Sequence, residues 1–600
     1  VHLRDLDVPA GTVWHGLPLQ DGRHVVRVYG VDDNPKGRRE ASYLTGTLLE
    51  MMKKNDLTPE MLWDDVEEDF LWFARLYPVC ETQEEAEGYA GLLYRMAEGT
   101  ADQNEVHKWK AMERTSLYES FHRADLKIIR SYERELESRI LARRFCEQLK
   151  EGVYYREALQ VFGKKGITEE IYRELMADAE KAEDALKIRI YYAISRFMKE
   201  TKRSLGGTLY DHTESLCFGH IRKRIYEDAV RHLPDSRRYA IQKEQVEVQL
   251  PVRVNWGGGW TDTPPQCNEM GGVVLNCAMK LRGICPVQVT VRKLEELEVQ
   301  FESQDVGVRG RTDRIEEIRD CHNPYDSFAL HKAALIACGI VPLEGTESLP
   351  EILKRMGGGI YLSTQVVGVP KGSGLGTSSI LSAACVKAIF AFLGQEIRND
   401  RISDMVLCME QIMSTGGGWQ DQVGGLTEGI KYITSGPGIH QELKIEPVTI
   451  SEGTKRELKE RFALIYTGQR RLARNLLRDV IGGYIGSRPE SVDALNKMAE
   501  KAVLMRFELE RGNVDGFARL LNVHWELSKQ LDAGSTNTCI DQIFIACEDL
   551  ICGRFITGAG GGGFLQVILK KGVSREQLQE RIYSVFQESG VGVWECELLI

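Results

Sequence analysis

A glycine-rich loop that runs directly into an apolar helix constrains this chain most. Residues 370–379 read PKGSGLGTSS, and the stretch that follows, ILSAACV, predicts a helix that closes near Gly394. Glycines let backbone approach a ligand and adopt positive φ, and the first N–H groups of a helix have no partner within it. Because the helix dipole adds partial positive charge there, the segment predicts a site for an anion such as phosphate.

Two familiar nucleotide-binding loops do not match this segment. A Walker A loop needs Gly-Lys followed by Ser or Thr, but Lys371 precedes the glycines. A dinucleotide fingerprint needs Gly or Ala three residues after Gly374, where Thr377 stands. Taken alone, a capped helix after a loop remains an alternative, because the hydroxyls of Thr377, Ser378 and Ser379 can cap the helix as well as bind phosphate or Mg²⁺.

Three further glycine-rich segments flank charged or aromatic residues. They read RVNWGGGWTDTPP at 253–265, GGGWQDQVGG at 416–425 and TGAGGGGF at 557–564. Asp262 can accept hydrogen bonds from two sugar hydroxyls, and Trp260 can lie against an apolar sugar face. Taken alone, the same pattern is equally typical of a strand turn with packed tryptophans and no ligand. Glu410 and Asp421 flank a glycine loop, so both can face one pocket, whereas a lone helical glutamate is more often a solvated charge.

The chain divides into three regions of different texture. Residues 1–45 read as short strands and turns, such as VVRVY at 25–29, and are too short to bury a core alone, so we expect the end of an upstream β domain. Residues 46–245 carry apolar residues at helical intervals, which predicts a helical linker region. From residue 246 strands such as 246–254 and 287–292 alternate with helices, which predicts a domain that mixes both.

Composition narrows the class of protein. Hydrophobic residues at 42% and charged residues at 28% are typical of a globular chain. No long apolar run predicts a membrane span, and the net charge of −11 argues against nucleic acid as the main partner. Fourteen cysteines without a CxxC pair favour reduced thiols in a cytoplasmic protein. Because the chain opens with Val1 and has no leader, we expect a fragment or a processed chain.

The four glycine-rich segments, in this order, resemble the GHMP small-molecule kinase superfamily, whose central loop is a proline followed by Gly-Leu-Gly-Ser-Ser. Thr377 stands in the first hydroxyl position here. Within the superfamily, residues 258–265, 372–381, 416–425 and 472–477 look like the fucokinases. The resemblance covers 246–600 closely and implies an α+β, two-lobed GHMP kinase fold with an N-lobe at about 246–435 and a C-lobe at about 436–600. An all-α region and a short β stub, the end of a β-helix, would precede it.

The resemblance implies ATP-dependent phosphorylation of L-fucose at its anomeric hydroxyl, in GDP-fucose salvage. Fucokinases are often fused behind a GDP-fucose pyrophosphorylase, and residues 1–45 look like the tail of such a domain. Another sugar-1-kinase, such as a heptose phosphate kinase, is the alternative reaction, because one sugar methyl group is worth only about 1–3 kcal/mol. An inactive sugar-binding module on the same fold is the alternative from another class. The sequence is also compatible with an oligomer.

Roles for individual residues follow from the same resemblance. Asp421 would take the proton of the anomeric hydroxyl, Arg253 would keep Asp421 ionised, and Ser378 and Glu410 would bind Mg²⁺ through oxygen. The backbone that would hold ATP phosphates comprises Gly372, Ser373, Gly374, Leu375, Gly376, Thr377 and Ser378. The substrate would contact Asp262, Trp260, Gly259, Gly418, Gly558, Gly560 and Gly561. Where family members commonly carry lysine before the last loop, this chain has Phe555, so no cationic role is assigned there.

Overall fold

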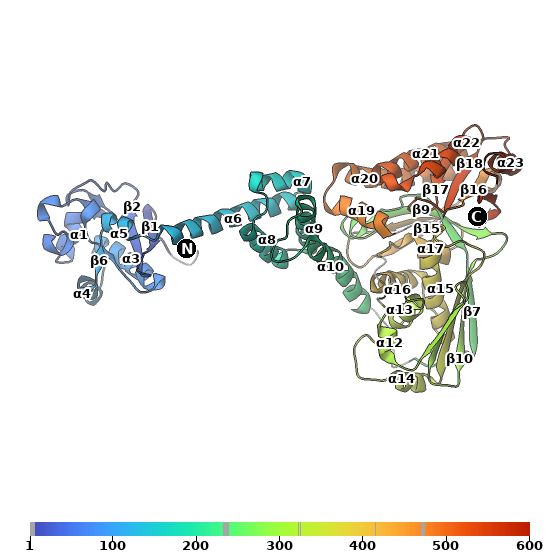
Figure 1. Ribbon diagram of the computed structural model, residues 1–600, viewed down its shortest axis with the longest axis horizontal. Helices are drawn as coiled ribbons and strands as arrows, with labels where there is room; N and C mark the ends of the chain where they lie inside the picture. Colours follow the sequence, from blue (N-terminus) through green and yellow to red (C-terminus); the bar gives the residue numbers. More distant parts are fainter. Residues whose placement is uncertain are drawn as a thin grey trace. The chain divides into compact units, whose positions relative to one another are not determined.

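The computed structural model describes residues 7–231, 239–321, 323, 326–413, 416–469, 474–587 and 589–600 (Figure 1). The chain forms two compact units, Val1–Ala142 and Arg143–Ile600. None of the helices in the described ranges combines the length and the apolar character that a membrane crossing requires.

The first unit packs an antiparallel hairpin against helices. Strands β1 (Thr12–Pro18) and β2 (His24–Gly30) pair in the register Thr12↔Gly30, which confirms the strand predicted at 25–29. β2 packs against helix α3 (Gln83–Glu98), and their common core extends along the chain to Trp109 and Leu117. The hairpin therefore shares its core with the helices that follow it, so residue 45 does not end a packing unit.

Short elements complete the first unit. They are β3 (Ser42–Tyr43), β4 (Gly46–Thr47), β5 (Tyr77–Pro78), β6 (Arg114–Thr115), α1 (Leu48–Lys54), α2 (Pro59–Leu62), α4 (Gln103–Ala111) and α5 (Leu117–Arg123). Helix α6 (Leu126–Lys150) begins in the first unit and ends in the second.

The second unit opens with the helices α7 (Tyr155–Ala158), α8 (Glu169–Lys181), α9 (Asp184–Thr201) and α10 (Tyr210–Arg231). The apolar residues of α9 between Ile188 and Phe197 are buried, as the helical intervals across this region predict, and α9 packs against α8 and α10. The predicted linker region 46–245 is thus divided between two packing units, because its first hundred residues close the core of the hairpin.

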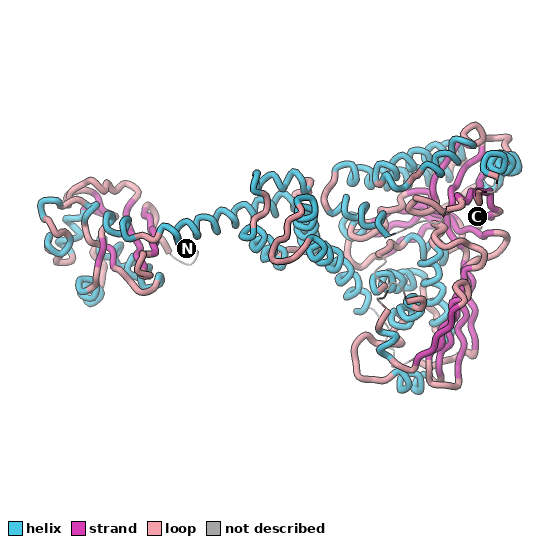
Figure 2. The backbone as a smooth tube through the Cα atoms, in the orientation of Figure 1, coloured by secondary structure: helices cyan, strands magenta, loops and turns pink. Residues whose placement is uncertain are grey.

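Sheets and helices interleave in the remainder of the second unit (Figure 2), as the α+β prediction requires. One sheet has the order β12-β11-β13-β10-β7, the next β15-β14-β9-β20 with β8 also on β9, and the third β17-β18-β16-β19. Their strands are β7 (Gln245–Leu250), β8 (Val252–Gly257), β9 (Gly272–Leu281), β10 (Val287–Leu294), β11 (Val299–Ser303), β12 (Val308–Thr312), β13 (Gly359–Val366), β14 (Ile430–Ser435), β15 (Leu443–Pro447), β16 (Phe462–Thr467), β17 (Ile551–Ile556), β18 (Phe564–Leu569), β19 (Val591–Trp594) and β20 (Cys596–Leu598).

The remaining helices of this part of the chain include α15, which is apolar on nearly every side and packs against β10, β7 and α16. They are α11 (Gln266–Met270), α12 (Ile315–Arg319), α13 (Ala329–Ala337), α14 (Leu349–Met356), α15 (Thr377–Phe392), α16 (Asn399–Ile412), α17 (Gln420–Leu426), α18 (Glu452–Arg461), α19 (Arg474–Ile485), α20 (Pro489–Glu510), α21 (Val514–Leu531), α22 (Thr538–Ala546) and α23 (Arg575–Phe586). Within the stretch 472–477, residues 472 and 473 lie outside the described ranges.

Two strands of the predicted C-lobe join the sheet of the predicted N-lobe. β15 pairs with β14, and the final strand β20 pairs with β9 in the register Leu598↔Met279. Both β15 and β20 belong to the predicted C-lobe at 436–600, yet they extend the sheet of the predicted N-lobe. A boundary near residue 435 therefore assigns most strands to the sheet in which they pair, with β15 and β20 as the exceptions.

Close packing between α21 and β17 gives a test of this core. A Cβ built on Gly553 would lie 2.9 Å from the Cα of Ala518, so Gly553→Ala should push helix and strand apart. We expect the free energy of unfolding, measured by urea denaturation, to fall by about 1–3 kcal/mol. The control is Gly592→Ala in β19 of the same sheet, where the added methyl meets nothing within 4 Å. Equal effects of the two substitutions would contradict the packing.

Candidate active site

A cavity of about 360 Å³ lies where the four glycine-rich segments meet, a volume that suits a small-molecule site. Its walls come from β8 and the following turn, the loop before α15, α16 with the loop to α17, α21, and the end of β17 with the loop after it. The lining residues are Arg253, Asn255, Gly259, Trp260, Asp262, Thr263, Gly372, Ser373, Gly374, Gly376, Thr377, Ser378, Ser379, Glu410, Gly417, Gly418, Gln420, Asp421, His524, Ser528, Phe555, Gly558 and Ala559.

The loop before α15 presents the helix N-terminus to this cavity. Gly376 is the N-cap with φ of 73°, and among the described residues no side chain caps the helix. A Cβ on Gly376 would lie 3.0 Å from the Cγ of Asp421, so only glycine allows this approach. The amide end of α15 is therefore open to the cavity beside a carboxylate, an arrangement that favours an anion at the amides.

Arg253 connects three of the cavity walls. From β8 its Nε and Nη2 donate to Oδ1 of Asp421 at 2.9 and 2.6 Å. Its Nη1 donates to the carbonyl oxygens of Gly374, at 2.9 Å, and Thr557, at 2.5 Å. The guanidinium is buried, and these partners satisfy the charge and donors that burial would otherwise penalise.

Asp421 lies at the start of α17, with its side chain 26% exposed. Both bonds from Arg253 reach the same oxygen, Oδ1, so Oδ2 is the oxygen that can meet a hydroxyl in the cavity. The family resemblance implied that Asp421 and Arg253 share one site, and the structure brings them into contact.

Glu410, at the end of α16, is buried on the opposite side of the α15 N-terminus. Its Oε1 accepts a hydrogen bond from the hydroxyl of Ser379, and its Oε2 accepts one from the backbone N–H of Gly417 at 3.2 Å. The predicted ligand Ser378 lines the same cavity and is exposed. The hydroxyl that contacts Glu410 is that of Ser379, the neighbour of the predicted Mg²⁺ ligand Ser378.

Asp262 is fully buried at the cavity wall and already has protein partners. Its Oδ2 accepts from the backbone N–H of Gln420 at 3.1 Å, and its Oδ1 accepts from the side-chain Nε2 at 2.9 Å. Burial, with a smaller contribution from the nearby Asp421, raises the pKa of Asp262 to about 7. The predicted binding of two sugar hydroxyls therefore has to share these oxygens with Gln420.

The predicted substrate contacts divide into those at the cavity and those away from it. Trp260, with φ of 81°, lines the cavity together with Gly259, Gly418 and Gly558.

Gly560 and Gly561 instead pack on the short helix Ala533–Ser535, where the N–H of Gly561 donates to the carbonyl of Ser535 at 2.9 Å. Leu375 is buried in the core rather than at the cavity. For these three residues the structure does not support a direct ligand contact.

Sequence patterns assigned no site role to several side chains that line the cavity, among them His524 and Phe555. His524 is buried on α21, and its Nε2 accepts from the backbone N–H of Gly258 at 2.9 Å. Burial lowers the pKa of His524 to about 3, so its ring is neutral. The ring of Phe555 lies edge to face with the imidazole of His524, with 4.7 Å between the ring centroids. The i, i+4 spacing of His524 and Ser528 was the available signal, but only the fold shows which face of α21 meets the cavity.

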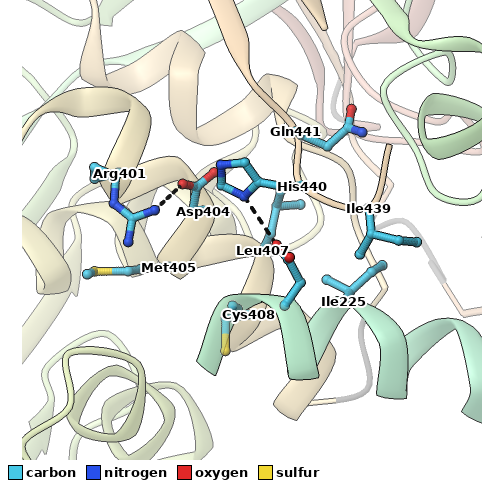
Figure 3. A pocket seen from close by; sticks show the side chains of 11 residues that line it. Ile225, Arg401, Asp404, Met405, Leu407, Cys408, Ile439, His440 and Gln441 are labelled. Atoms are coloured by element: carbon cyan, nitrogen blue, oxygen red, sulfur yellow. Dashed lines mark hydrogen bonds and ion pairs between the residues drawn. The ribbon is translucent and has the colours of Figure 1, made fainter. Parts of the chain in front are cut away.

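A smaller pocket of about 30 Å³ lies between α10, α16 and residues 439–441 (Figure 3). It has room for about one water molecule. Its charged side chains are paired, with Nδ1 of His440 at 3.1 Å from Asp228 and Nη1 of Arg401 at 2.9 Å from Asp404. Burial raises the pKa of Asp404. This cluster joins helices and does not provide a second substrate site.

Comparison with known families and proteins agrees with the cavity's location. Residues 347–429, which include the loop before α15, match the GHMP kinases N terminal domain. Residues 2–82 match the Fucose pyrophosphorylase domain.

Two curated relatives match along nearly the whole chain. The chain is 31% identical over 587 residues to the L-fucokinase/L-fucose-1-P guanylyltransferase of Bacteroides fragilis, covering 94% of the chain and 59% of that protein. It is 28% identical over 612 residues to the bifunctional fucokinase/GDP-fucose pyrophosphorylase of Arabidopsis thaliana, covering 94% of the chain and 55% of that protein. The chain therefore spans somewhat more than half the length of these relatives.

A third relative matches a little more than half of the chain. The D-glycero-alpha-D-manno-heptose 7-phosphate kinase of Campylobacter jejuni is 24% identical over 376 residues, covering 58% of the chain and 98% of that protein. These similarities confirm the predicted GHMP kinase fold: residues 347–429 match the GHMP kinases N terminal domain, and the chain is similar over 94% of its length to two bifunctional fucokinase relatives.

Proposed function

We propose that the chain transfers the γ-phosphoryl group of ATP to the anomeric hydroxyl of L-fucose. The observation that carries this proposal is the position of Asp421 beside the open amide end of α15, in one cavity of small-molecule size. The two bifunctional relatives, whose names include fucokinase activity, support the choice of sugar.

The proposed step needs an acceptor oxygen in line with the bond that breaks. The anomeric oxygen attacks the γ-phosphorus, the bond from that phosphorus to the bridging oxygen of ADP breaks, and the hydroxyl proton passes to Oδ2 of Asp421. The products are L-fucose 1-phosphate and ADP. Because phosphoryl transfer depends mainly on positioning and charge stabilisation, the fixed geometry of Arg253 and Asp421 is the chain's main contribution.

The donor set beside the phosphate end suits Mg²⁺. Glu410, Ser378 and Ser379 offer only oxygen atoms, the ligand type that hard cations prefer, and Glu410 is fixed by the N–H of Gly417. Within the described ranges no group of three or more His, Cys, Asp or Glu side chains is placed to hold a metal, so ATP phosphates and water would complete the ligand set. A bound Mg²⁺ would neutralise charge on the phosphates.

The wider context follows from the relatives. The match of residues 2–82 to the Fucose pyrophosphorylase domain supports fusion with a pyrophosphorylase in GDP-fucose salvage, in which the sugar 1-phosphate made here would be consumed. We place this activity in the cytoplasm, where ATP and reduced thiols are available. A heptose phosphate kinase is the second candidate, because a relative with that name matches 58% of the chain.

The choice between these sugars has a direct test. ADP release by the purified chain should be measured with ATP, Mg²⁺ and a panel containing L-fucose, D-arabinose, D-galactose and a heptose 7-phosphate. We expect the largest kcat/KM with L-fucose. A larger kcat/KM with the heptose phosphate would establish the second candidate. If none of the sugars on the panel supported ADP release, the inactive binding module would be the remaining alternative.

Asp421→Asn tests the proton acceptor. The amide keeps the shape of the side chain but cannot take the proton, so kcat should fall about 10²–10⁴-fold while L-fucose and ATP still bind, as measured by calorimetry. Asp493→Asn on α20 is the control, because that carboxylate is 48% exposed and pairs only with Lys497 among the described residues. A kcat within twofold of wild type for Asp421→Asn would refute the role.

Glu410→Gln tests the metal site. The substitution removes one charge and leaves the volume unchanged, so the Mg²⁺ concentration for half-maximal rate should rise at least about tenfold, as read from a metal titration of ADP release. Glu396→Gln, at an exposed position just after α15, should leave the titration unchanged. Identical curves for both variants would make Glu410 a structural partner of Ser379 and nothing more.

A further inference from the structure

His524 carries a buried donor that the fold does not use. Its Nε2 accepts from the N–H of Gly258, so in the neutral ring the proton must reside on Nδ1. That Nδ1 is buried and has no partner among the described residues, although His524 lines the cavity. The side chain is only 1% exposed. Buried polar groups in native proteins almost always have a partner, so this donor indicates an absent ligand.

Two unused acceptors line the same cavity. Oδ1 of Asn255 and Oε1 of Gln420 are buried and likewise lack a partner within the described ranges. Nε2 of Gln420 donates to Oδ1 of Asp262, which leaves Oε1 as the side-chain atom of Gln420 without a partner among the described residues. Three side chains that line the cavity therefore carry one donor and two acceptors without a partner among the described residues.

A hydroxyl group matches this set, because it donates one hydrogen bond and accepts others. A phosphate does not, since unprotonated phosphate oxygens only accept and would be repelled by the amide oxygens of Asn255 and Gln420. The Phe555 ring, edge to face with the imidazole, holds the plane of His524, so the donor direction is set before a ligand arrives.

We infer that His524, with Asn255 and Gln420, forms a subsite that binds a sugar hydroxyl and contributes to the choice of sugar. The inference rests on the proposed function and deepens it, since it assigns substrate contacts to residues that no family resemblance or relative assigned. His524 acts here as a binding residue, and its Nδ1–H donates to the hydroxyl oxygen while an amide oxygen accepts the hydroxyl proton.

Two substitutions separate the two ring nitrogens. His524→Gln keeps an acceptor near the position of Nε2 for the N–H of Gly258 but has no donor at Nδ1. His524→Asn places an amide near Nδ1 but cannot reach Gly258. We expect His524→Gln to raise the KM for L-fucose about tenfold or more, with the KM for ATP within twofold of wild type. His524→Asn should retain more of the sugar affinity and lose more thermal stability.

Monodeoxy analogues of L-fucose identify the hydroxyl. With wild type, one analogue should show a raised KM, and that penalty should vanish in His524→Gln, because the variant lacks the donor. Should His524→Gln fail to fold, the Nδ1 resonance of ¹⁵N-histidine-labelled wild type, assigned with His524→Asn, should shift on adding L-fucose and not on adding ATP alone.

The outcomes distinguish this inference from the function on which it rests. If L-fucose supports ADP release but His524→Gln matches wild type in its KM, or the Nδ1 resonance does not move, the inference alone is overturned. A parallel rise in the KM values for sugar and ATP would reduce His524 to a structural residue and also overturn it. If no sugar supports ADP release, the proposed function and this inference fail together.

Discussion

The guanidinium of Arg253 is the interaction on which the cavity depends. It joins Asp421 to the loop before α15 and to the loop after β17, segments separated by 168, 121 and 304 residues from Arg253. A buried cation must have partners for its charge and donors, and the planar fork of arginine can satisfy several at once. These walls therefore cannot move independently, and the carboxylate is held in one place relative to the amide end of α15.

Around this pair the cavity has two chemically different ends. The α15 amides, with Glu410 and Ser379 beside them, offer backbone donors and oxygen ligands, which suit phosphate with a bound cation. The end formed by His524, Asn255 and Gln420 offers neutral donors and acceptors, which suit hydroxyl groups. Asp421 lies at the amide end, fixed by Arg253 and pressed against Gly376, and its second oxygen remains for an acceptor hydroxyl. A kinase that transfers the γ-phosphoryl group of ATP to a sugar hydroxyl needs this combination.

Predictions from sequence succeeded where the signal is local. The loop at 370–379, the helix after it, the strands at 25–29 and 287–292 and the buried positions of α9 all follow from glycine content and from apolar periods of two or about 3.6 residues. The contact of Arg253 with Asp421 was implied only by family resemblance. The site roles that the resemblance implied stay predictions, and the structure adds protein partners beside them: the N–H of Gly561 donates to Ser535, Gln420 donates to Asp262, and the hydroxyl of Ser379, next to the predicted ligand Ser378, donates to Glu410.

By itself, the sequence determined which segments are helix, strand or glycine loop, because those depend on neighbours a few residues apart. Only the tertiary structure decided that the hairpin at residues 12–30 shares a core with later helices, that β20 joins the sheet of β9, and that His524 faces the cavity. Each of these depends on pairs of residues far apart along the chain, and many pairings bury similar apolar area. One pairing of strands and helices is favoured only by the packing of the entire fold. A local sequence pattern therefore could not identify the partner of each buried polar group.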